Sequence, residues 1–365
     1  MLSTTTSTVV PDAAAAPVLD DGQPSILGTP TAVGLDRRTL LKGAGVALGV
    51  LLLGLLVPSV INDPYYMGIA ADGVVLGIMA LGIGFLAFRS GLISLGNTAF
   101  YGGAAYGLAI ATTHWGWGPT QAALFGLVGG TLLSVVVGAL CIRITGFGFL
   151  MLTLAFGQAL YAVSTLTSVR SVTGAFDGLA VTYGPNDTFF GLTQAQLGAA
   201  DTFWPLAWVS LVIVAFGLWL VGRSRFGVVL EAVRENEERA RFSGYNTYLP
   251  RLAAFTIAGF AASLAGVLFA LKASFVSPDV LGFVTAGDSL IATLVGGFTV
   301  LAGPVVGAIL YIYAQGEFGD TGNLQLYMGI ALIVAVVFLP GGIVGFVVQQ
   351  FERLRGRLGR RGGSS

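Results

Sequence analysis

Charged residues are scarce in this sequence of 365 residues. Asp, Glu, Lys and Arg together make up 10% of it, whereas a soluble domain carries roughly 25%, because its surface must face water. Acidic and basic residues are equal in number, at 18 each, so net charge does not indicate a nucleic-acid partner. A chain with so little charge must expose most of its surface to lipid.

Cysteine and histidine are nearly absent. The only cysteine, Cys141, has no second cysteine with which to form a disulfide or a metal site. The only histidine, His114, lies beside Trp115 and Trp117 in a pattern typical of the aromatic belt at a membrane interface. We therefore predict no metal site and no catalytic residue.

Lysine is also rare, and its scarcity excludes one type of ATP-binding site. Neither Lys42 nor Lys272 stands in a G-x-x-x-x-G-K-[ST] sequence, so the chain has no P-loop for ATP. We predict no cofactor on this chain. Any energy source must therefore be an ion gradient or a partner ATPase, or the chain uses none.

Hydrophobic residues make up 55% of the sequence, and 54 residues are glycine, which allows close packing of membrane helices. Crossing a bilayer as a helix takes about 20 apolar residues. We predict an all-α fold, a polytopic transmembrane helix bundle of about ten spans. Eight of them are expected at residues 40–61, 66–88, 92–113, 121–142, 147–167, 204–222, 252–271 and 325–346, and two short ones within 286–316, joined by a tight turn at Ala302-Gly303-Pro304.

Basic residues fall almost entirely on one side of this topology. Lys and Arg accumulate in cytoplasmic loops, so we predict that both termini are cytoplasmic, N-in and C-in. Only Arg170 and Lys272 then lie outside. Residues 1–36 are predicted to be a disordered cytoplasmic tail, 37–350 the transmembrane domain and 351–365 a basic cytoplasmic tail.

The loop 223–251 is the most informative cytoplasmic segment. Its charges alternate at helical spacing, as where Glu231 precedes Glu235 and Glu237 precedes Arg241 by four residues, which predicts one short amphipathic helix. A helix lying on the membrane is one interpretation. From Glu231 to Arg251 the loop carries four Glu and four Arg, which fits an anionic lipid surface poorly, because such surfaces favour basic faces. A protein partner is therefore favoured.

Several short stretches occur in a fixed order and together form a specific pattern. They are GLISLGNTAF (91–100) with 102–106, LTLAFGQ (152–158), TGAFDGL (173–179), EAVRENE (231–237) with Ala240 and Gly244, VSPD (276–279) and GGFTVLAGP (296–304). The pattern resembles the permease subunits of branched-chain amino acid ABC importers. It is most similar to the longer, M-type subunit, and also to the urea permease of that family.

The resemblance implies a pore subunit that moves a small polar or zwitterionic solute inward across the bacterial cytoplasmic (inner) membrane. Branched-chain amino acids, urea or short amides are the implied solutes. The implied partners are two ATP-binding subunits that use ATP, a related sister permease in a heterodimer, an extracytoplasmic solute-binding protein and membrane lipid, with no nucleic acid. Coupling to the ATPase is implied for Glu231, Ala232, Arg234, Glu235, Glu237, Ala240, Arg241 and Gly244.

Several polar residues lie inside the apolar spans. An unsatisfied polar group is costly in lipid, so these side chains should face a wet pathway or form hydrogen bonds between helices. For each residue taken alone, lining a pathway and bonding between helices are equally well supported. Nearby glycines favour the pathway role for Asn97 and Thr98. The predicted pathway residues are Asn97, Thr98, Phe100, Thr153, Phe156 and Gln158.

Two other function classes stay open from the residues alone. An ion-coupled secondary transporter or channel would use Asp72 or Asp288 and need no ATPase. Both carboxylates are expected near the outer ends of their spans, where a solvated or capping role is favoured over a proton relay. A membrane protein with only an anchoring or assembly role is the third class.

Overall fold

The computed structural model describes residues 37–61, 63–144, 146–184, 187–319, 326–327, 329–330, 333 and 341–350, and these are mostly α-helical. Six helical segments in them are long and apolar enough to cross a membrane, which agrees with a multi-pass helix bundle. They are Arg37–Val60, made of α1 (Arg37–Leu55) and α2 (Val57–Val60), then α3 (Pro64–Ser90), α5 (Pro119–Cys141), α6 (Phe147–Thr165), α9 (Ala200–Arg223) and α12 (Tyr248–Ala273).

Further helices complete the bundle and its connections. The predicted span 325–346 and both predicted tails lie largely or wholly outside the described residues, although residues 342–350 are helical. The remaining elements are α4 (Asn97–Trp115), η1 (Thr167–Val169), α7 (Arg170–Thr173), η2 (Ala175–Asp177), β1 (Leu179–Ala180), α8 (Gln194–Gly198), α10 (Arg225–Glu235), α11 (Glu237–Phe242), β2 (Phe275–Val276), η3 (Pro278–Leu281), α13 (Phe283–Gly296) and α14 (Gly303–Phe318).

Helix α3 is the central helix of the bundle. It is apolar on all sides, as expected for a helix that is buried all round, and it packs against α9, α12 and α14. Its start is fixed by Asp63, whose side chain accepts a hydrogen bond from the Tyr65 amide at 2.9 Å, with Pro64 in the first turn. The helix therefore has a defined start and an interior that touches most of the bundle.

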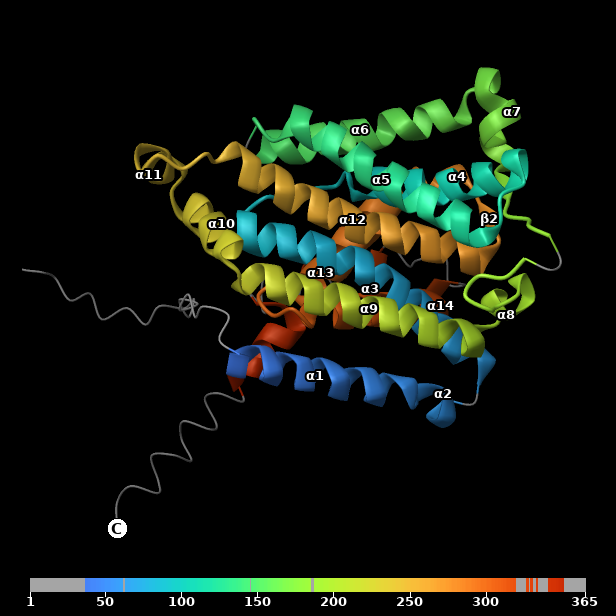
Figure 1. The fold of residues 1–365 in the computed structure, drawn as a ribbon, viewed down its shortest axis with the longest axis horizontal. Coiled ribbons are helices and arrows are strands. Elements are labelled where there is room, and N and C mark those ends of the chain that lie inside the picture. Colours follow the sequence, from blue (N-terminus) through green and yellow to red (C-terminus); the bar gives the residue numbers. More distant parts are fainter. Residues whose placement is uncertain are drawn as a thin grey trace, which may run out of the picture. The chain divides into compact units, whose positions relative to one another are not determined.

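Helix α1 lies at the periphery and packs against α9 (Figure 1). Trp204 and Trp208 of α9 donate indole hydrogen bonds to the carbonyl groups of Gly54 and Val50, at 2.7 and 3.2 Å. Most other side chains of α1 are exposed, including Leu41, at 65%. This is the surface expected of a helix that faces lipid on most sides.

The elements divide between two ends of the bundle. Helices α10 and α11 lie at one end, and α7, α8 and β2 at the other (Figure 1). The predicted cytoplasmic basic residues gather at the α10–α11 end, which we call the basic end: Arg89 meets Glu231 there, and Arg143 and Arg251 line one cleft. Arg170, in α7, and Lys272, in the last turn of α12, lie at the opposite end.

Two predicted boundaries were wrong. Helix α4 begins at Asn97 rather than at residue 92, after a connection in which the Ser94 hydroxyl accepts a hydrogen bond from the Gly96 amide at 3.1 Å. The two short helices are joined by residues 297–302 rather than by a tight turn at 302–304, because Pro304 is tolerated in the first turn of α14. The fold is also not strictly all-α, since β1 pairs with β2.

Helices α12 and α4 make close contact where they cross. A β-carbon added at Gly266 would lie 2.0 Å from the carbonyl oxygen of Tyr101, so the two backbones touch at this point. A side chain at 266 would have to push the helices apart. Small residues permit such contacts between membrane helices.

We expect Gly266→Ala to destabilise the folded chain by about 1–3 kcal/mol, because the added methyl group overpacks a backbone contact. Gly217→Ala is the matched control, since Gly217 lies in α9 with nothing within 4 Å of the added carbon. Thermal unfolding of the detergent-purified variants measures the difference. Equal melting temperatures for the two variants would contradict the packing described.

Candidate functional site

The loop 223–251 folds as two helices, so the prediction of a single amphipathic helix was wrong. Helix α10 starts after Ser224, whose hydroxyl accepts a hydrogen bond from the Gly227 amide at 3.4 Å. It ends before Asn236, which has an extended backbone and whose side chain accepts from the Arg239 amide at 2.9 Å. Asparagine competes with the helix in this way, and here it stops α10 and caps α11.

Helix α10 rests on the bundle through a narrow apolar face. Gly227, Leu230 and Val233 are buried at a spacing of three residues, and they pack against α3, α9 and α12. Val228, next to Gly227, is apolar but 42% exposed. The helix therefore presents its other sides to the solvent at the basic end.

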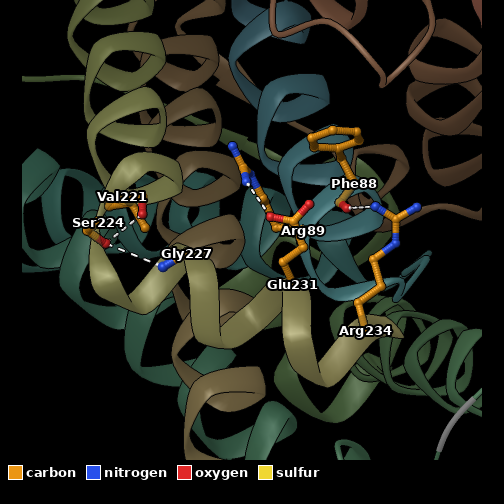
Figure 2. Close-up of polar contacts among 7 residues, drawn as sticks. All are labelled: Phe88, Arg89, Val221, Ser224, Gly227, Glu231 and Arg234. Carbon is orange, nitrogen blue, oxygen red and sulfur yellow. Dashed lines mark hydrogen bonds and ion pairs between the residues drawn. The ribbon is translucent and has the colours of Figure 1, made fainter. Parts of the chain in front are cut away.

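Two arginines fasten α10 to the last turn of α3 (Figure 2). The guanidinium group of Arg234 donates a hydrogen bond to the carbonyl oxygen of Phe88 and lies 5.4 Å from the centre of the Phe88 ring. Arg89 reaches from α3 to Glu231 of α10, with 3.6 Å between Nη1 and Oε2. We call these contacts the α3–α10 joint.

The unpaired carbonyl groups at the end of α3 explain why an arginine contacts it in the α3–α10 joint. The last four carbonyl groups of a helix lack partners within it and carry partial negative charge. Arg234 satisfies one of them, and an interaction of this type contributes about 0.3–1 kcal/mol, or more when partly buried. Gly91 ends α3 with φ +68°, and a β-carbon there would approach the Arg234 side chain to 3.2 Å.

A second joint fastens α11 to the first turns of α12. Arg251 donates from Nη1 to Oε2 of Glu237 at 2.7 Å, and the Thr247 hydroxyl donates to Oε1 at 3.1 Å. Partial burial raises the pKa of Glu237, but the hydrogen bonds and charge of Arg251 and the bond from Thr247 outweigh it and hold this pKa below its ordinary value. The side chain of Arg251 is only 9% exposed.

Glu231 and Glu237 thus form salt bridges to the membrane helices, and the described part of the chain shows none to residues four positions away. Their partners Arg89 and Arg251 were counted from the sequence only as orientation residues. Phe88 was not singled out at all. The signal that could have found them is their position, since each arginine lies within the last or first turns of a long apolar helix.

The residues predicted to couple to an ATPase divide into two groups. Glu231, Arg234 and Glu237 are engaged in the two joints, and Ala240 is buried beside them. The others are exposed, and no salt bridge of theirs is found among the described residues. These exposed residues are Ala232, Glu235, Arg241 and Gly244.

The predicted pathway residues are only partly brought together. The start of α4 meets α6: a β-carbon at Gly157 would lie 3.5 Å from the Thr98 hydroxyl, and one at Gly96 would lie 2.9 Å from Thr153. Asn97, Thr98 and Thr153 are buried, and the Thr153 hydroxyl donates to the carbonyl of Leu150 at 3.0 Å. These polar residues therefore line a common contact between α4 and α6.

Two buried polar atoms in this region are unusual. Oδ1 of Asn97 and Nε2 of Gln158 have no hydrogen-bond partner in the part of the chain that the structure describes. Buried polar groups are normally satisfied, so each such atom calls for an explanation. Asn97 does use its other amide atom, Nδ2, to donate to the Ser94 carbonyl at 3.2 Å.

The two aromatic residues of the predicted pathway set lie differently. Phe100 is fully buried and packs edge-on against Phe255 of α12, with ring centres 5.4 Å apart, so it belongs to the core between α4 and α12. Phe156 of α6 is partly buried against that core.

At the opposite end, two recognised motifs that are distant in sequence lie side by side. Leu179 of the 173–179 motif pairs with Val276 of the 276–279 motif in the β1–β2 ladder. His114 approaches the Val172 carbonyl, with 3.1 Å between Nε2 and the oxygen. The connections at this end are therefore tied to one another and to the end of α4.

Both acidic residues considered for ion coupling, Asp72 and Asp288, have side-chain partners. Asp72 of α3 accepts from Lys272 of α12 at 2.5 Å, and the same ammonium group donates to the Gly68 carbonyl at 3.1 Å. Asp288 of α13 forms a side-chain hydrogen bond with Tyr311 of α14. The first contact ties two spanning helices together near the opposite end.

Comparison with known proteins gives a consistent result. A family model described as "Branched-chain amino acid transport system / permease component" matches residues 65–339. The high-affinity branched-chain amino acid transport system permease protein LivM of Salmonella typhimurium strain LT2 is 27% identical over 311 residues, 79% of this chain and 72% of the relative. LivM of Escherichia coli K12 is 28% identical over 304 residues, 76% of this chain and 70% of the relative.

A shorter match involves another import system. The autoinducer 2 import system permease protein LsrC of Escherichia coli O157:H7 is 33% identical over 107 residues, which is 29% of this chain and 31% of the relative. No solved structure matches the chain.

The α11–α12 joint leads to a prediction about pH. Glu237→Gln should destabilise the protein by about 3 kcal/mol at neutral pH, because it leaves the buried Arg251 charge without its partner. The pKa of Glu237 is lowered in the folded state, so its contribution is complete above the ordinary value of about 4.5 and is lost as pH falls through the lower, folded value.

Thermal unfolding from pH 7 to pH 3 measures this effect, with the exposed neighbour Glu238→Gln as the control. The difference in melting temperature between the wild-type protein and Glu237→Gln should shrink at the acidic end of the range. A difference that stays constant with pH, or an equal loss in both variants, would refute the joint's electrostatic role.

Proposed function

We propose a function for this chain on one premise: it belongs to the permease-component family of branched-chain amino acid transport systems. It is a multi-pass protein of the bacterial inner membrane, as its relatives are. We propose that it forms part of the translocation pore of an ABC importer that moves a small polar or zwitterionic solute inward. The chain acts without catalysis of its own, and a separate ATPase supplies the energy.

The basic end is proposed to face the cytoplasm. Residues Arg89, Arg143, Arg223 and Arg251 gather there from four spanning helices or their ends, and basic residues mark cytoplasmic loops. This orientation places the N-terminus and C-terminus inside and fits about ten spans. The β1–β2 end then faces outward, where we propose that a solute-binding protein delivers the solute.

The α3–α10 joint is the observation that carries the proposal. Helix α10 is exposed on one side and is fastened on the other to the end of the central helix. A push on α10 must move α3 or break the joint. We propose that two ATP-binding subunits press on the exposed residues Ala232, Glu235, Arg241 and Gly244, and that the anchored residues transmit the movement.

The α4–α6 contact is the proposed solute pathway. The unpartnered Asn97 oxygen and Gln158 nitrogen offer one acceptor and one donor within an apolar bundle, which suits a small polar solute. Thr98, Thr153 and Phe156 lie on the same two helices. Helix α6 also exposes Phe147 and Met151 on its outer side, and we propose that the sister permease packs there to form a heterodimer.

The solute class is inferred from the relatives. LivM is named for branched-chain amino acids and LsrC for autoinducer 2, so related permeases serve chemically different small solutes. We propose a branched-chain amino acid as the first solute to test, with urea and short amides as the next. Competition by unlabelled solutes against labelled leucine uptake distinguishes them.

Glu231→Gln should reduce ATP-driven uptake roughly tenfold while the ATPase subunits stay bound, because the variant weakens transmission rather than docking. The measurement uses the importer complex in proteoliposomes, with uptake and ATPase co-purification scored together. The exposed neighbour Glu238→Gln is the matched control and should retain wild-type uptake. The charge swap Arg89→Glu with Glu231→Arg should restore part of the loss.

Two results would contradict this assignment. One is solute uptake driven by an ion gradient without the ATPase subunits, which would favour a secondary transporter. The other is loss of ATPase binding in Glu231→Gln with no loss in Glu235→Ala, which would reverse the roles of the anchored and the exposed residues.

The alternative of ion-coupled transport is tested at Asp72. Asp72→Asn should lower stability by about 1–3 kcal/mol, because Lys272, whose side chain is 13% exposed, loses its partner. Uptake per folded molecule should stay within about twofold of the wild type, and the double variant with Lys272→Gln should recover stability. Asp201→Asn, exposed in the first turn of α9, is the control.

Thermal unfolding and uptake with and without a proton or sodium gradient measure the two effects separately. If folded Asp72→Asn protein loses uptake, Asp72 acts in transport and the structural role proposed for it is refuted.

A further inference from the structure

A cleft of about 430 Å³ opens at the basic end, between the end of α5, helix α11 and the start of α12. Its polar lining is Arg143, Glu237, Arg241, Thr247, Tyr248 and Arg251. Three lining residues are cationic and one is anionic. The proposed function places Arg241 among the residues that contact the ATP-binding subunits, but it assigns no ligand to the cleft itself.

The lone carboxylate of the cleft is already engaged. Glu237 uses both of its oxygens, one for Arg251 and one for Thr247. Arg143 and Arg241 are exposed, and neither has a salt bridge among the described residues. Arg251 keeps one buried group, its Nε–H, without a partner in the described part of the chain. With three cationic side chains and one anionic one, the lining of the cleft has an excess of positive charge among the described residues.

The walls of the cleft are held in place by hydrogen bonds. The Tyr248 hydroxyl donates to the Ala139 carbonyl of α5 at 3.0 Å, which ties α12 to α5 across the back of the cleft. The Asn246 side chain accepts from the Tyr248 amide at 2.9 Å and fixes the start of α12. The guanidinium groups therefore stand on a rigid frame, which lowers the entropy lost when they bind an anion.

The cleft lies where the lipid-facing surface of α5 ends. Leu132, Val136 and Leu140 are 59%, 57% and 58% exposed at a spacing of four residues, so they form one apolar stripe along α5. Arg143 follows directly after this helix. An acyl chain that lies along the stripe has its headgroup at the level of Arg143.

We propose that this cleft binds the anionic headgroup of a phospholipid from the cytoplasmic leaflet. Arg143 and Arg241 contact the phosphate through their planar guanidinium groups, which match phosphate geometry, while the acyl chains follow the α5 stripe. A lipid is favoured over an acidic residue of a protein partner because Arg143 of the cleft follows the exposed apolar stripe of α5 by three residues, after Leu140.

The sequence hides this site because residues 231–251 carry four Glu and four Arg and so have no net charge. Folding changes that balance in two ways. It pairs Glu237 with Arg251, and it brings Arg143 to the cleft from a different part of the chain. Glu235 and Glu238 do not line the cleft, so its lining is positive although residues 231–251 have no net charge.

The test uses the complete importer complex, delipidated in detergent, with binding measured by native mass spectrometry and thermal shift. The probes are dioctanoyl phosphatidylglycerol, dioctanoyl phosphatidylcholine and inorganic phosphate. Arg143→Gln with Arg241→Gln should weaken phosphatidylglycerol binding roughly 30-fold, because each arginine near an anionic surface contributes about fivefold. The same pair changed to Lys should keep most of the binding, which controls for folding.

Arg225→Gln with Arg239→Gln removes the same charge from exposed positions outside the cleft, and it should leave phosphatidylglycerol binding within about twofold. Several results would overturn the proposal. They are equal binding of phosphatidylcholine, equal binding of inorganic phosphate, equal loss in both Gln pairs, and unchanged lipid binding with loss of the ATPase subunits. The last result would assign the cleft to a carboxylate of the partner.

Discussion

The capping of α3 by Arg234 is the interaction on which the arrangement at the basic end depends. Helix α3 is buried along most of its length and contacts α9, α12, α13 and α14, so its position sets theirs. Its last carbonyl groups must find donors outside the helix. Arg234 supplies one such donor from α10, and Glu231 of α10 pairs with the Arg89 side chain of α3, so the exposed loop and the buried core are held together by these contacts.

The sequence predicts the bounds of single helices well, but it predicts the contacts between helices poorly. Apolar runs placed α3, α5, α6 and α12 within a few residues of their true ends, because span length and hydrophobicity are local properties. The break at Asn236 was missed, since an asparagine within a charged helical pattern can either continue or cap a helix. The partners of Glu231 and Glu237 come from other helices, and helical spacing carries no information about them.

The polar residues of the predicted pathway follow the same rule. Asn97 and Phe100 stand three residues apart on α4, yet Asn97 keeps a buried amide oxygen without a partner among the described residues and Phe100 packs against α12. The sequence identifies both as residues inside a span. Only the packing of neighbouring helices shows that Phe100 is a core residue and that the Asn97 amide oxygen has no partner among the described residues. The same limit applies to Leu179 and Val276, whose pairing depends on the whole bundle.

Some charged side chains at the basic end form contacts within the two joints, and others stay exposed. Arg89, Arg234 and Arg251 are held by intrachain partners, so they stabilise the fold and are less available to other molecules. The exposed remainder is acidic on α10, at Glu235, and basic beside α5, at Arg143. The basic end thus presents an acidic and a basic side chain at separate places. A protein partner at Glu235 and an anionic lipid at Arg143 can bind there together, and Arg241 is the one side chain that both proposed contacts use.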